Sequence, residues 1–217
     1  MVAFSIFGFS VYWYGIFYAL AFLLGYIALA WIGKKGFFAG YPKLQKLLTE
    51  QLEDLIFTIA VGVVLGGRLG HILIYGEGYY FQHWEAILKI WEGGMSFIGG
   101  IFGVLISIFV FFRLQGLSKR DYLMTFDLML IFVPLGIFLG RFGNFLNQEL
   151  YGIPVEQLPS WISSFLTGFG LTHMYPKVDQ LLRVNTNLLS MLLEGMLLLV
   201  LQVSVFWRQI KKRQRKV

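Results

Sequence analysis

Long apolar stretches dominate this chain of 217 residues and restrict the folds open to it. A helix that crosses a bilayer needs about 20 consecutive apolar residues. Hydrophobic residues make up 57% of the chain and charged residues only 14%, whereas a soluble domain carries about 25% charged residues. We therefore predict an all-α integral membrane protein and exclude a cytosolic enzyme or a DNA-binding domain. The candidate spans are 9–32, 55–75, 95–114, 122–140 and 188–207.

The basic residues predict the orientation of these spans, because positive charge gathers on the cytoplasmic side of a membrane. The first and third connections and the C-terminal tail are basic, whereas the second connection, 76–94, is acidic. This alternation places the N-terminus outside and the tail in the cytoplasm. We expect one transmembrane domain over 1–207 and a basic cytoplasmic tail over 208–217. The tail carries the whole net charge of +6, which favours contact with anionic lipid and not with nucleic acid.

Two outer connections have aromatic residues at helical spacing, in 81–92 and in 159–170. Such segments are typical of helices that lie in the headgroup layer. Two interpretations remain open for them. They are an ordinary aromatic belt, which is common in membrane proteins, or a lid over a site that lipids can enter.

Several ionisable residues fall within the predicted spans, namely Arg68, His71, Asp127 and Glu194, with Arg141 at the outer rim of the fourth span. Each such residue raises the free energy of membrane insertion by about 2.5–3.5 kcal/mol, so its presence in a span calls for a structural or functional explanation. An ion pair between Arg68 and Glu194 that only holds helices together is one explanation. The excess of arginine over acid at the outer level favours another, an anionic ligand bound by guanidinium groups.

Glycines repeat at helical spacing in three spans and predict close helix packing. They are Gly62, Gly66 and Gly70 in the second span, Gly99 and Gly103 in the third, and Gly136 and Gly140 in the fourth. The chain has no cysteine, which excludes disulfides and thiolate chemistry of its own. Its three histidines are scattered, so we predict no metal site.

The most specific polar segment reads Gly140-Arg141-Phe142-Gly143-Asn144-Phe145-Leu146-Asn147-Gln148-Glu149-Leu150-Tyr151-Gly152. On a helix, Arg141, Asn144 and Gln148 would share one face. So many polar groups at a membrane edge indicate a site for a polar headgroup or a wet cavity. The segment resembles the signature of the prolipoprotein diacylglyceryl transferase family, Gly-Arg-x-Gly-Asn-Phe-x-Asn-x-Glu-x-x-Gly, at every fixed position.

Further boxes support this resemblance, which covers essentially the whole chain in order. They are Trp13-Tyr14-Gly15, Gly66-Gly67-Arg68-Leu69-Gly70, Gly93-Gly94-Met95-Ser96-Phe97, Gly99-Gly100, Asp127, and Leu192-Leu193-Glu194-Gly195. The chain departs from the family at Ile98, where a catalytic His is usual. The family box Arg-His-Pro-Ser-Gln-Leu-Tyr-Glu is Arg183-Val184-Asn185-Thr186-Asn187-Leu188-Leu189-Ser190 here. The family also has seven spans.

The resemblance implies an enzyme of the bacterial cytoplasmic membrane that moves a diacylglyceryl group from phosphatidylglycerol to the lipobox cysteine of a prolipoprotein. It also implies that this reaction needs no cofactor. It implies that Arg141 and Arg183 hold the phosphate. The other implied substrate-binding residues are Asn144, Asn147 and Glu149, supported by Tyr14, Arg68 and Glu194. The implied structural residues are Asp127, Gly99, Gly100, Gly140 and Gly143.

The base that would deprotonate the substrate thiol is missing from its usual position, now Ile98. His71 lies one turn from Arg68 and is the alternative base, although a lone histidine beside an arginine is more often a structural hydrogen-bonding partner. A positive site would also lower the thiol pKa without any base. Two other functions remain open. One is a family member that binds phospholipid or precursor without turnover, and the other is a small transporter or channel subunit. We expect a monomer.

Overall fold

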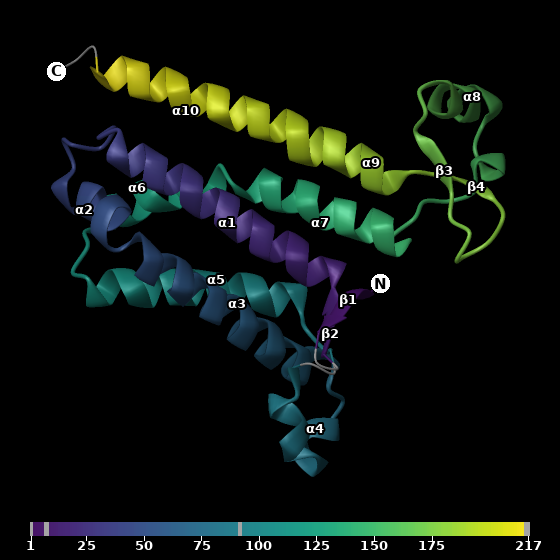
Figure 1. Ribbon diagram of the computed structural model, residues 1–217, viewed down its shortest axis with the longest axis horizontal. Helices are drawn as coiled ribbons and strands as arrows, with labels where there is room; N and C mark the ends of the chain where they lie inside the picture. Colours follow the sequence, from purple (N-terminus) through teal and green to yellow (C-terminus); the bar gives the residue numbers. More distant parts are fainter. Residues whose placement is uncertain (1, 7–8, 91–92, 215–217) are drawn as a thin grey trace. The chain divides into compact units, whose positions relative to one another are not determined.

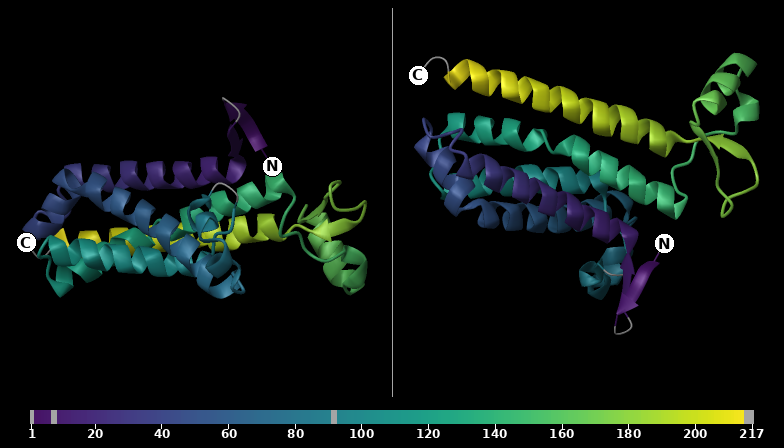
Figure 2. Two further views of the ribbon diagram at one scale, coloured as in Figure 1. Left: turned by 90° about the horizontal axis from the view of Figure 1, so that it is seen from below. Right: turned by 45° about the horizontal axis from the view of Figure 1, so that its top comes forward.

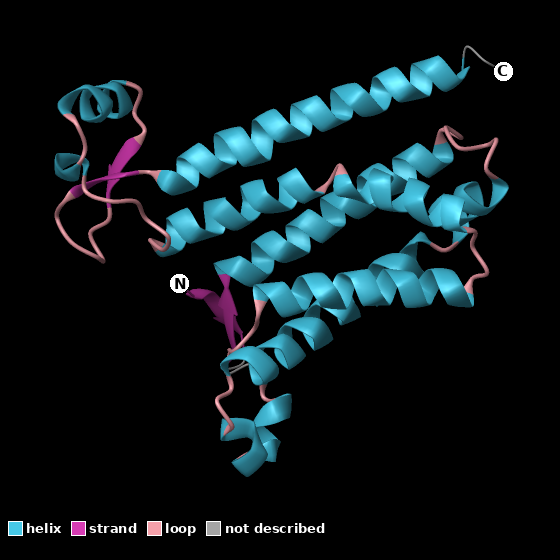
Figure 3. Ribbon diagram, turned by 180° about the vertical axis from the view of Figure 1, so that it is seen from behind, coloured by secondary structure: helices cyan, strands magenta, loops and turns pink. Residues whose placement is uncertain are grey.

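The computed structural model describes the backbone of residues 2–6, 9–90 and 93–214, with the side chains of 2, 6, 9–12, 14 and 212–214 left out. Within these residues, five helical segments are long and apolar enough to cross a membrane. They are Gly15–Lys34, Leu52–Tyr75, Phe97–Leu114, Lys119–Asn147 and Thr186–Lys211. Each overlaps one predicted span, and helices dominate the structure (Figures 1 and 3), so the predicted all-α membrane fold is confirmed.

The elements follow one another with short connections. The longer helices are α1 (Trp13–Lys34), α2 (Pro42–Glu50), α3 (Leu52–Tyr75), α5 (Phe97–Leu114), α6 (Lys119–Leu130), α7 (Val133–Asn147), α8 (Ser160–Gly168) and α10 (Leu198–Gln214). The short ones are α4 (Tyr79–Gln82), α9 (Thr186–Ser190), the 3-10 helices η1 (Trp84–Leu88) and η3 (Val155–Gln157), and the π-helix η4 (Met191–Leu197). Two antiparallel hairpins pair β1 (Val2–Ile6) with β2 (Phe9–Tyr12) and β3 (Thr172–Met174) with β4 (Leu182–Val184).

Two predicted spans need correction. The first was expected to begin at residue 9, but residues 9–12 form strand β2 and α1 begins at Trp13. Hydropathy alone does not separate a short apolar strand from the start of a helix. The fourth was expected to be one helix over 122–140, but a turn separates α6 from α7. Pro134 lies in the first turn of α7, where its missing N–H costs least.

The connection predicted as one helix over 81–92 also differs. It contains the short α4 and the 3-10 helix η1, while residues 91–92 lie outside the described part of the chain. Gly78, Gly93 and Gly94 have positive φ angles, which interrupt regular helix on both sides. In contrast, a helix predicted within 159–170 is present as α8.

The chain forms two compact units, which we call the central unit (Tyr26–Phe126) and the terminal unit (Met1–Gly25 with Asp127–Val217). The expected single transmembrane domain over 1–207 stays a prediction. In the central unit, α3 and α5 pack through the predicted glycines. A Cβ on Gly66 would lie 2.4 Å from the Gly99 carbonyl oxygen, and one on Gly70 would lie 2.5 Å from the Gly99 Cα. These two helices therefore pack backbone against backbone.

The amphipathic α2 closes one end of the central unit. Leu44, Leu47 and Leu48 lie on its apolar face and are almost completely buried. The Lys43 ammonium donates to the Gly116 carbonyl oxygen at 2.6 Å, which ties the connection after α5 to α2. The Arg120 guanidinium lies over the Tyr41 ring and donates to its hydroxyl at 3.0 Å. Arginine and lysine thus hold the basic connections of this unit together.

In the terminal unit, α7 packs against η4, α9 and α10. A Cβ on Gly195 would lie 2.8 Å from the Phe138 Cβ, so this glycine allows η4 to approach α7. The fourth-span glycines do not act in this way, because a Cβ on Gly136 or Gly140 would meet nothing within 4 Å. Residues 148–185, which we call the head, lie at the end of α7 and α9 (Figure 2).

Candidate active site

The signature segment spans the end of α7 and the loop that follows. Gln148 was expected to share a helical face with Arg141 and Asn144, but α7 ends at Asn147 and Gln148 adopts the left-handed conformation (φ 60°, ψ 43°). This residue caps the helix, since the Glu149 N–H donates back to the Asn144 carbonyl at 2.9 Å. The Gln148 side chain instead accepts from the Lys177 N–H at 2.8 Å. The expected polar face is therefore reduced to Arg141 and Asn144.

The loop after α7 is strained. Leu150 has a φ of 50°, which is unusual for a residue with a branched side chain. Together with Gln148, it places Glu149 between two residues in the left-handed region. Such strain persists only where the surroundings hold it, and it often marks functional sites. The Glu149 side chain is exposed.

Residues 184–187 supply the contacts that hold this loop. The Asn187 amide donates to the Glu149 carbonyl at 2.8 Å, and the Thr186 hydroxyl donates to the Leu150 carbonyl at 2.6 Å. The Gly152 N–H donates to the Val184 carbonyl at 3.0 Å. A Cβ on Gly152 would lie 2.7 Å from that same oxygen, which explains the need for glycine. The loop is thus clamped against the start of α9.

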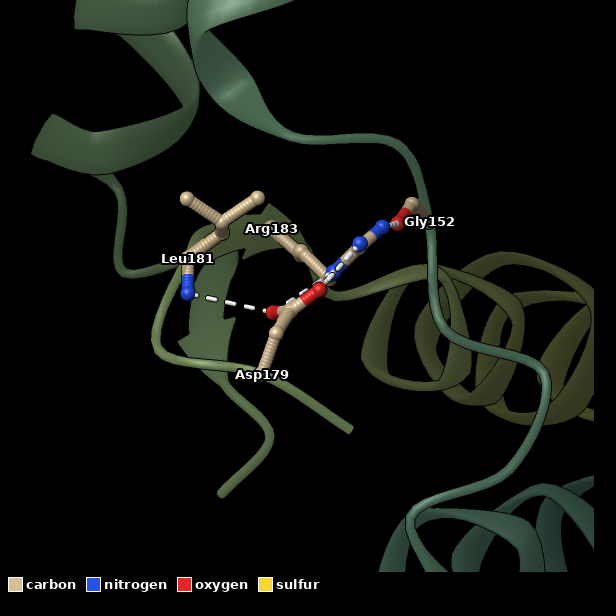
Figure 4. Close-up of polar contacts among 4 residues, drawn as sticks. All are labelled: Gly152, Asp179, Leu181 and Arg183. Atoms are coloured by element: carbon tan, nitrogen blue, oxygen red, sulfur yellow. Dashed lines mark hydrogen bonds and ion pairs between the residues drawn. The ribbon is translucent and has the colours of Figure 1, made fainter. Parts of the chain in front are cut away.

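Arg183, on β4, makes its hydrogen bonds within the head, through all three guanidinium nitrogens (Figure 4). Its guanidinium bonds the Asp179 carboxylate, with Nη2 at 2.5 Å from Oδ2, and Nη1 donates to the Gly152 carbonyl at 3.0 Å. The cation also lies 4.9 Å from the centre of the Tyr151 ring. The hydrogen bond from Arg183 lowers the pKa of Asp179 and in turn raises the pKa of Arg183. The pair therefore stays ionised at neutral pH.

Aromatic side chains join the head to α7. The His173 ring lies 5.0 Å from both the Phe145 and the Tyr175 rings, measured between centroids. Tyr175 is fully buried, and its hydroxyl donates to the Asn185 side-chain oxygen at 3.1 Å. Burial raises the pKa of Tyr175, and the nearby Asn187 amide lowers it by less. His173 therefore belongs to a packed structural cluster.

Arg141 and Asn144 have unused hydrogen-bonding capacity. The Arg141 guanidinium is half-buried and makes no hydrogen bond or ion pair with any described residue. Asn144 is 4% exposed, and its side-chain oxygen accepts no hydrogen bond within the described part of the chain. The Asn187 side-chain oxygen is a second buried acceptor of this kind. Buried acceptors are nearly always satisfied in native proteins, so a ligand or water is expected here.

Arg68 and His71 lie on α3, in the central unit. The Arg68 guanidinium donates from Nε to the Ile87 carbonyl at 2.8 Å and from Nη1 to the Gly93 and Gly94 carbonyls at 2.7 and 3.0 Å. These bonds and one from Nη2 to Ala86 satisfy the cation without a carboxylate. His71 is half-buried, with its ring 6.1 Å from the Tyr80 ring.

The other predicted site residues are placed as follows. Asn147 ends α7, and Gly143 is buried within it. Asp127 on α6 and Glu194 on η4 are exposed. Tyr14 is in the first turn of α1, with its side chain outside the described residues. Gly100 has the Val63 carbonyl 3.9 Å from its Cβ position, an ordinary contact. Ile98, in the first turn of α5, is 49% exposed.

A profile of the prolipoprotein diacylglyceryl transferase family matches residues 1–217. The chain belongs to this family. Similar proteins include the phosphatidylglycerol–prolipoprotein diacylglyceryl transferase of Methylobacillus flagellatus, with 36% identity over 99% of this chain and 74% of that protein. The corresponding transferase of Aromatoleum aromaticum is 39% identical over 91% and 67%, and that of Bordetella avium is 37% identical over 94% and 69%.

Thr186 and Asn187 are two residues of the site that were not predicted from the sequence. The family box has Ser and Gln where this chain has Thr186 and Asn187. Hydroxyl and carboxamide are kept at both positions, and both side chains bond the signature loop. Chemical type, and not residue identity, was the signal that could have found them. Asp179, which pairs with Arg183, had no signal in the sequence.

Proposed function

We propose that this chain transfers a diacylglyceryl group from phosphatidylglycerol to the thiol of a prolipoprotein's lipobox cysteine. The observation that carries the proposal is the pair Arg141 and Asn144 in a chain of this transferase family. Among the described residues, the Arg141 guanidinium has no hydrogen-bonding partner, and neither does the buried side-chain oxygen of Asn144, three residues later. A phosphate group suits Arg141, because guanidinium binds phosphate oxygens through two parallel hydrogen bonds.

The proposed reaction is a displacement at carbon. The substrate sulfur forms a C–S bond with the diacylglyceryl carbon, and the C–O bond to the phosphate breaks. Glycerol phosphate leaves with the bonding electrons, and the thiol proton passes to a base. Negative charge grows on the leaving phosphate, so a cation bound there is worth more in the transition state than in the ground state.

Arg141 and Asn144 have separate parts in this proposal. Arg141 neutralises the leaving phosphate, and the Asn144 oxygen accepts a hydrogen bond from a glycerol hydroxyl of the headgroup. Asn147 and Glu149 contribute to substrate binding at the end of α7 and in the strained loop. The roles of Tyr14 and Glu194 in substrate binding stay predictions.

Arg183 is the less favoured phosphate ligand. Its guanidinium already bonds Asp179 and the Gly152 carbonyl, so a phosphate would have to replace the carboxylate. We assign Arg183 to holding the head in place, and its predicted direct contact with phosphate requires that exchange.

The base is the open part of the mechanism, because Ile98 cannot accept a proton. We propose His71 for this role. A positioned general base contributes about 10²–10⁴-fold, so His71→Gln is expected to reduce turnover by that order. Ile98 is 49% exposed, which leaves room for an imidazole. Ile98→His is then expected to raise turnover, with a rising limb near the ordinary histidine pKa of about 6.5.

The alternative is a family member that binds phospholipid or precursor without turnover, and Ile98 is the residue that favours it. The two functions are separated by incubating the purified chain with a lipobox peptide in phosphatidylglycerol vesicles. Transfer predicts a diacylglyceryl mass increase on the peptide and an equal amount of glycerol phosphate. Vesicles of phosphatidylethanolamine alone are the control. Lipid binding without a mass increase in either the wild type or Ile98→His would establish the alternative.

The apolar helices and the bacterial relatives identify a multi-pass bacterial membrane protein. The finer topology is part of the proposal: an outside N-terminus, a cytoplasmic tail and a monomer. Since the chain has no cysteine, single cysteines near each end can be labelled with a membrane-impermeant reagent in intact cells. Labelling of the C-terminal cysteine under those conditions would reverse the orientation.

A further inference from the structure

The connection between α3 and α5, residues 76–96, exposes large apolar side chains, and we call it the interfacial segment. Phe81 is 91% exposed, Trp84 75% and Leu88 74%. Both short helices of the segment, α4 and η1, contribute to this apolar surface. Figure 1 shows α4 at the end of α3. An apolar surface of this kind needs a partner.

Arg68 holds the interfacial segment at a defined position along the axis of α3. Four hydrogen bonds from its guanidinium reach the carbonyls of Ala86, Ile87, Gly93 and Gly94. They satisfy four of its five N–H groups, and the arginine is only 7% exposed. Two of these carbonyls belong to η1, so the short helix that carries Trp84 and Leu88 is tied directly to α3.

Backbone contacts independently place the segment at the same position along α3. The Ser96 N–H donates to the Gly67 carbonyl at 2.8 Å, so α5 begins beside Gly67 and not beside the end of α3 at Tyr75. A Cβ on Gly94 would lie 2.7 Å from both Arg68 Nη1 and His71 Nε2. The segment therefore returns along the last two turns of α3, about 12 Å of helix.

That position along α3 lies within the thickness of the bilayer. The 24 residues of α3 extend about 36 Å, against about 30 Å of hydrocarbon. Its last two turns consequently cross the boundary between acyl chains and headgroups. Neighbouring residues of the same helix are lipid-facing in character, since Leu69 and Leu73 are large, apolar and exposed. The interfacial segment carries exposed apolar side chains of the same kind, Phe81, Trp84 and Leu88.

We propose that the interfacial segment is a membrane anchor that inserts Phe81, Trp84 and Leu88 at the boundary between acyl chains and headgroups. Arg68 is its positioning residue, and the partner is the lipid bilayer. The tryptophan and phenylalanine suit this layer, where aromatic rings are enriched. Because the guanidinium is used by backbone carbonyls, Arg68 sets the depth of the anchor and does not bind a phosphate.

Site-directed spin labelling tests the depth, and the absence of cysteine allows single-cysteine variants directly. The variants are Phe81→Cys and Trp84→Cys, with Leu73→Cys as a lipid-facing reference and Glu85→Cys as the matched control on η1. In phosphatidylglycerol-containing vesicles, labels at 81 and 84 are expected to collide with oxygen as often as the label at 73. The label at 85 is expected to favour a water-soluble nickel relaxant. Water-exposed labels at 81 and 84 would overturn the proposal.

A peptide partner is distinguished in the same samples. Addition of a lipobox peptide is expected to leave the labels at 81 and 84 unchanged. Labels that are water-accessible alone and become protected only with the peptide would make the segment a peptide-docking surface and overturn the lipid assignment.

The positioning role of Arg68 is tested in the labelled background. Lysine presents its donors from one nitrogen, so Arg68→Lys is expected to free the segment and raise the mobility of the label at 84. Arg113→Lys, at an exposed arginine, is the control. Should Arg68→Lys fail to fold, Gly94→Ala places a Cβ against Arg68 Nη1. Its control Gly78→Ala shares a positive φ but has nothing within 4 Å. Unchanged label mobility in both Arg68→Lys and Gly94→Ala would overturn the positioning role.

Discussion

The connection after α3 and the connection after α7 are both held by an arginine, and they use it differently. In the central unit, all the hydrogen bonds that Arg68 makes with described residues go to backbone carbonyls. In the terminal unit, Arg183 bonds a carboxylate and one carbonyl, while Asn187 and Thr186 clamp the strained loop. The second arrangement uses three more side chains, those of Asp179, Thr186 and Asn187, and Arg141 has no partner among the described residues.

This difference separates structural from ligand-binding arginines. A guanidinium whose N–H groups are already satisfied has little left for a phosphate, whereas one with free donors beside a buried free acceptor has both the charge and the geometry. Sequence position alone did not make this distinction, since Arg68, Arg141 and Arg183 all lie in family motifs.

Arg68→Gln is expected to have the largest effect, on folding. It removes the cation that satisfies four carbonyls, and a buried group left without its partner costs about 1–3 kcal/mol. We expect a loss of at least about 3 kcal/mol of stability. Thermal unfolding in detergent and protease cleavage within 76–96 are the measurements. Arg113→Gln, at an exposed arginine, serves as the control, and equal stability of the two variants would contradict the structural role of Arg68.

Arg141→Lys is expected to reduce turnover by about ten- to a hundredfold, because lysine keeps the charge but loses the planar fork. Stability should not change, since the guanidinium bonds no described residue. Peptide lipidation and thermal unfolding of the same preparation measure both. A variant that loses stability while keeping its turnover would exchange the roles given to Arg141 and Arg68.

Asn187→Ala is expected to have an intermediate effect, about 1–2 kcal/mol on the clamp. It leaves the Glu149 carbonyl without its donor and should speed hydrogen exchange at the Gly152 amide. Turnover should fall less than in Arg141→Lys. Thr186→Val removes the neighbouring hydroxyl bond to Leu150 and is the matched comparison. Exchange at Gly152 that is unchanged in both variants would show that the clamp does not hold the loop.

Asp179 gives the smallest effect, and it depends on pH. The hydrogen bond from Arg183 lowers the pKa of Asp179 in the folded protein, so the ionised carboxylate favours the folded head. This contribution is complete above the unfolded pKa of about 3.9 and is lost as the pH falls through the lower folded value. The protection of the Leu181 amide against hydrogen exchange, measured relative to its intrinsic rate at each pH, should therefore fall on acidification, because its N–H donates to Asp179. The Asp179→Asn variant should lack this dependence.

The spans were predictable because length and hydropathy almost determine a membrane helix. What could not be predicted depends on polar contacts between distant residues. The turn before α7 could have been predicted from Pro134, which lies in the first turn of that helix. The form of the 81–92 connection depends on Arg68 drawing the carbonyls of η1 toward α3, which no local pattern reveals.

The candidate site was predicted in part. The signature correctly drew attention to Arg141 and Asn144, but a helical face does not show where the helix ends, and Gln148 therefore was misplaced. In the box at 183–190, only Arg183 and Leu188 are identical to the family's residues, so a comparison by residue identity did not reveal the role of the other positions. In the structure, the Thr186 hydroxyl and the Asn187 amide donate to the signature loop, so a hydroxyl and a carboxamide stand where the family box has Ser and Gln.

Photocrosslinking with a phosphatidylglycerol analogue that carries its reactive group on the headgroup tests most directly whether Arg141 binds the phosphate. We expect labelled peptides from residues 140–150 in the wild type and in Arg183→Lys, with labelling strongly reduced in Arg141→Gln. Labelling confined to the basic residues 208–214, or labelling of 140–150 that persists in Arg141→Gln, would contradict the assignment of Arg141 as the phosphate ligand.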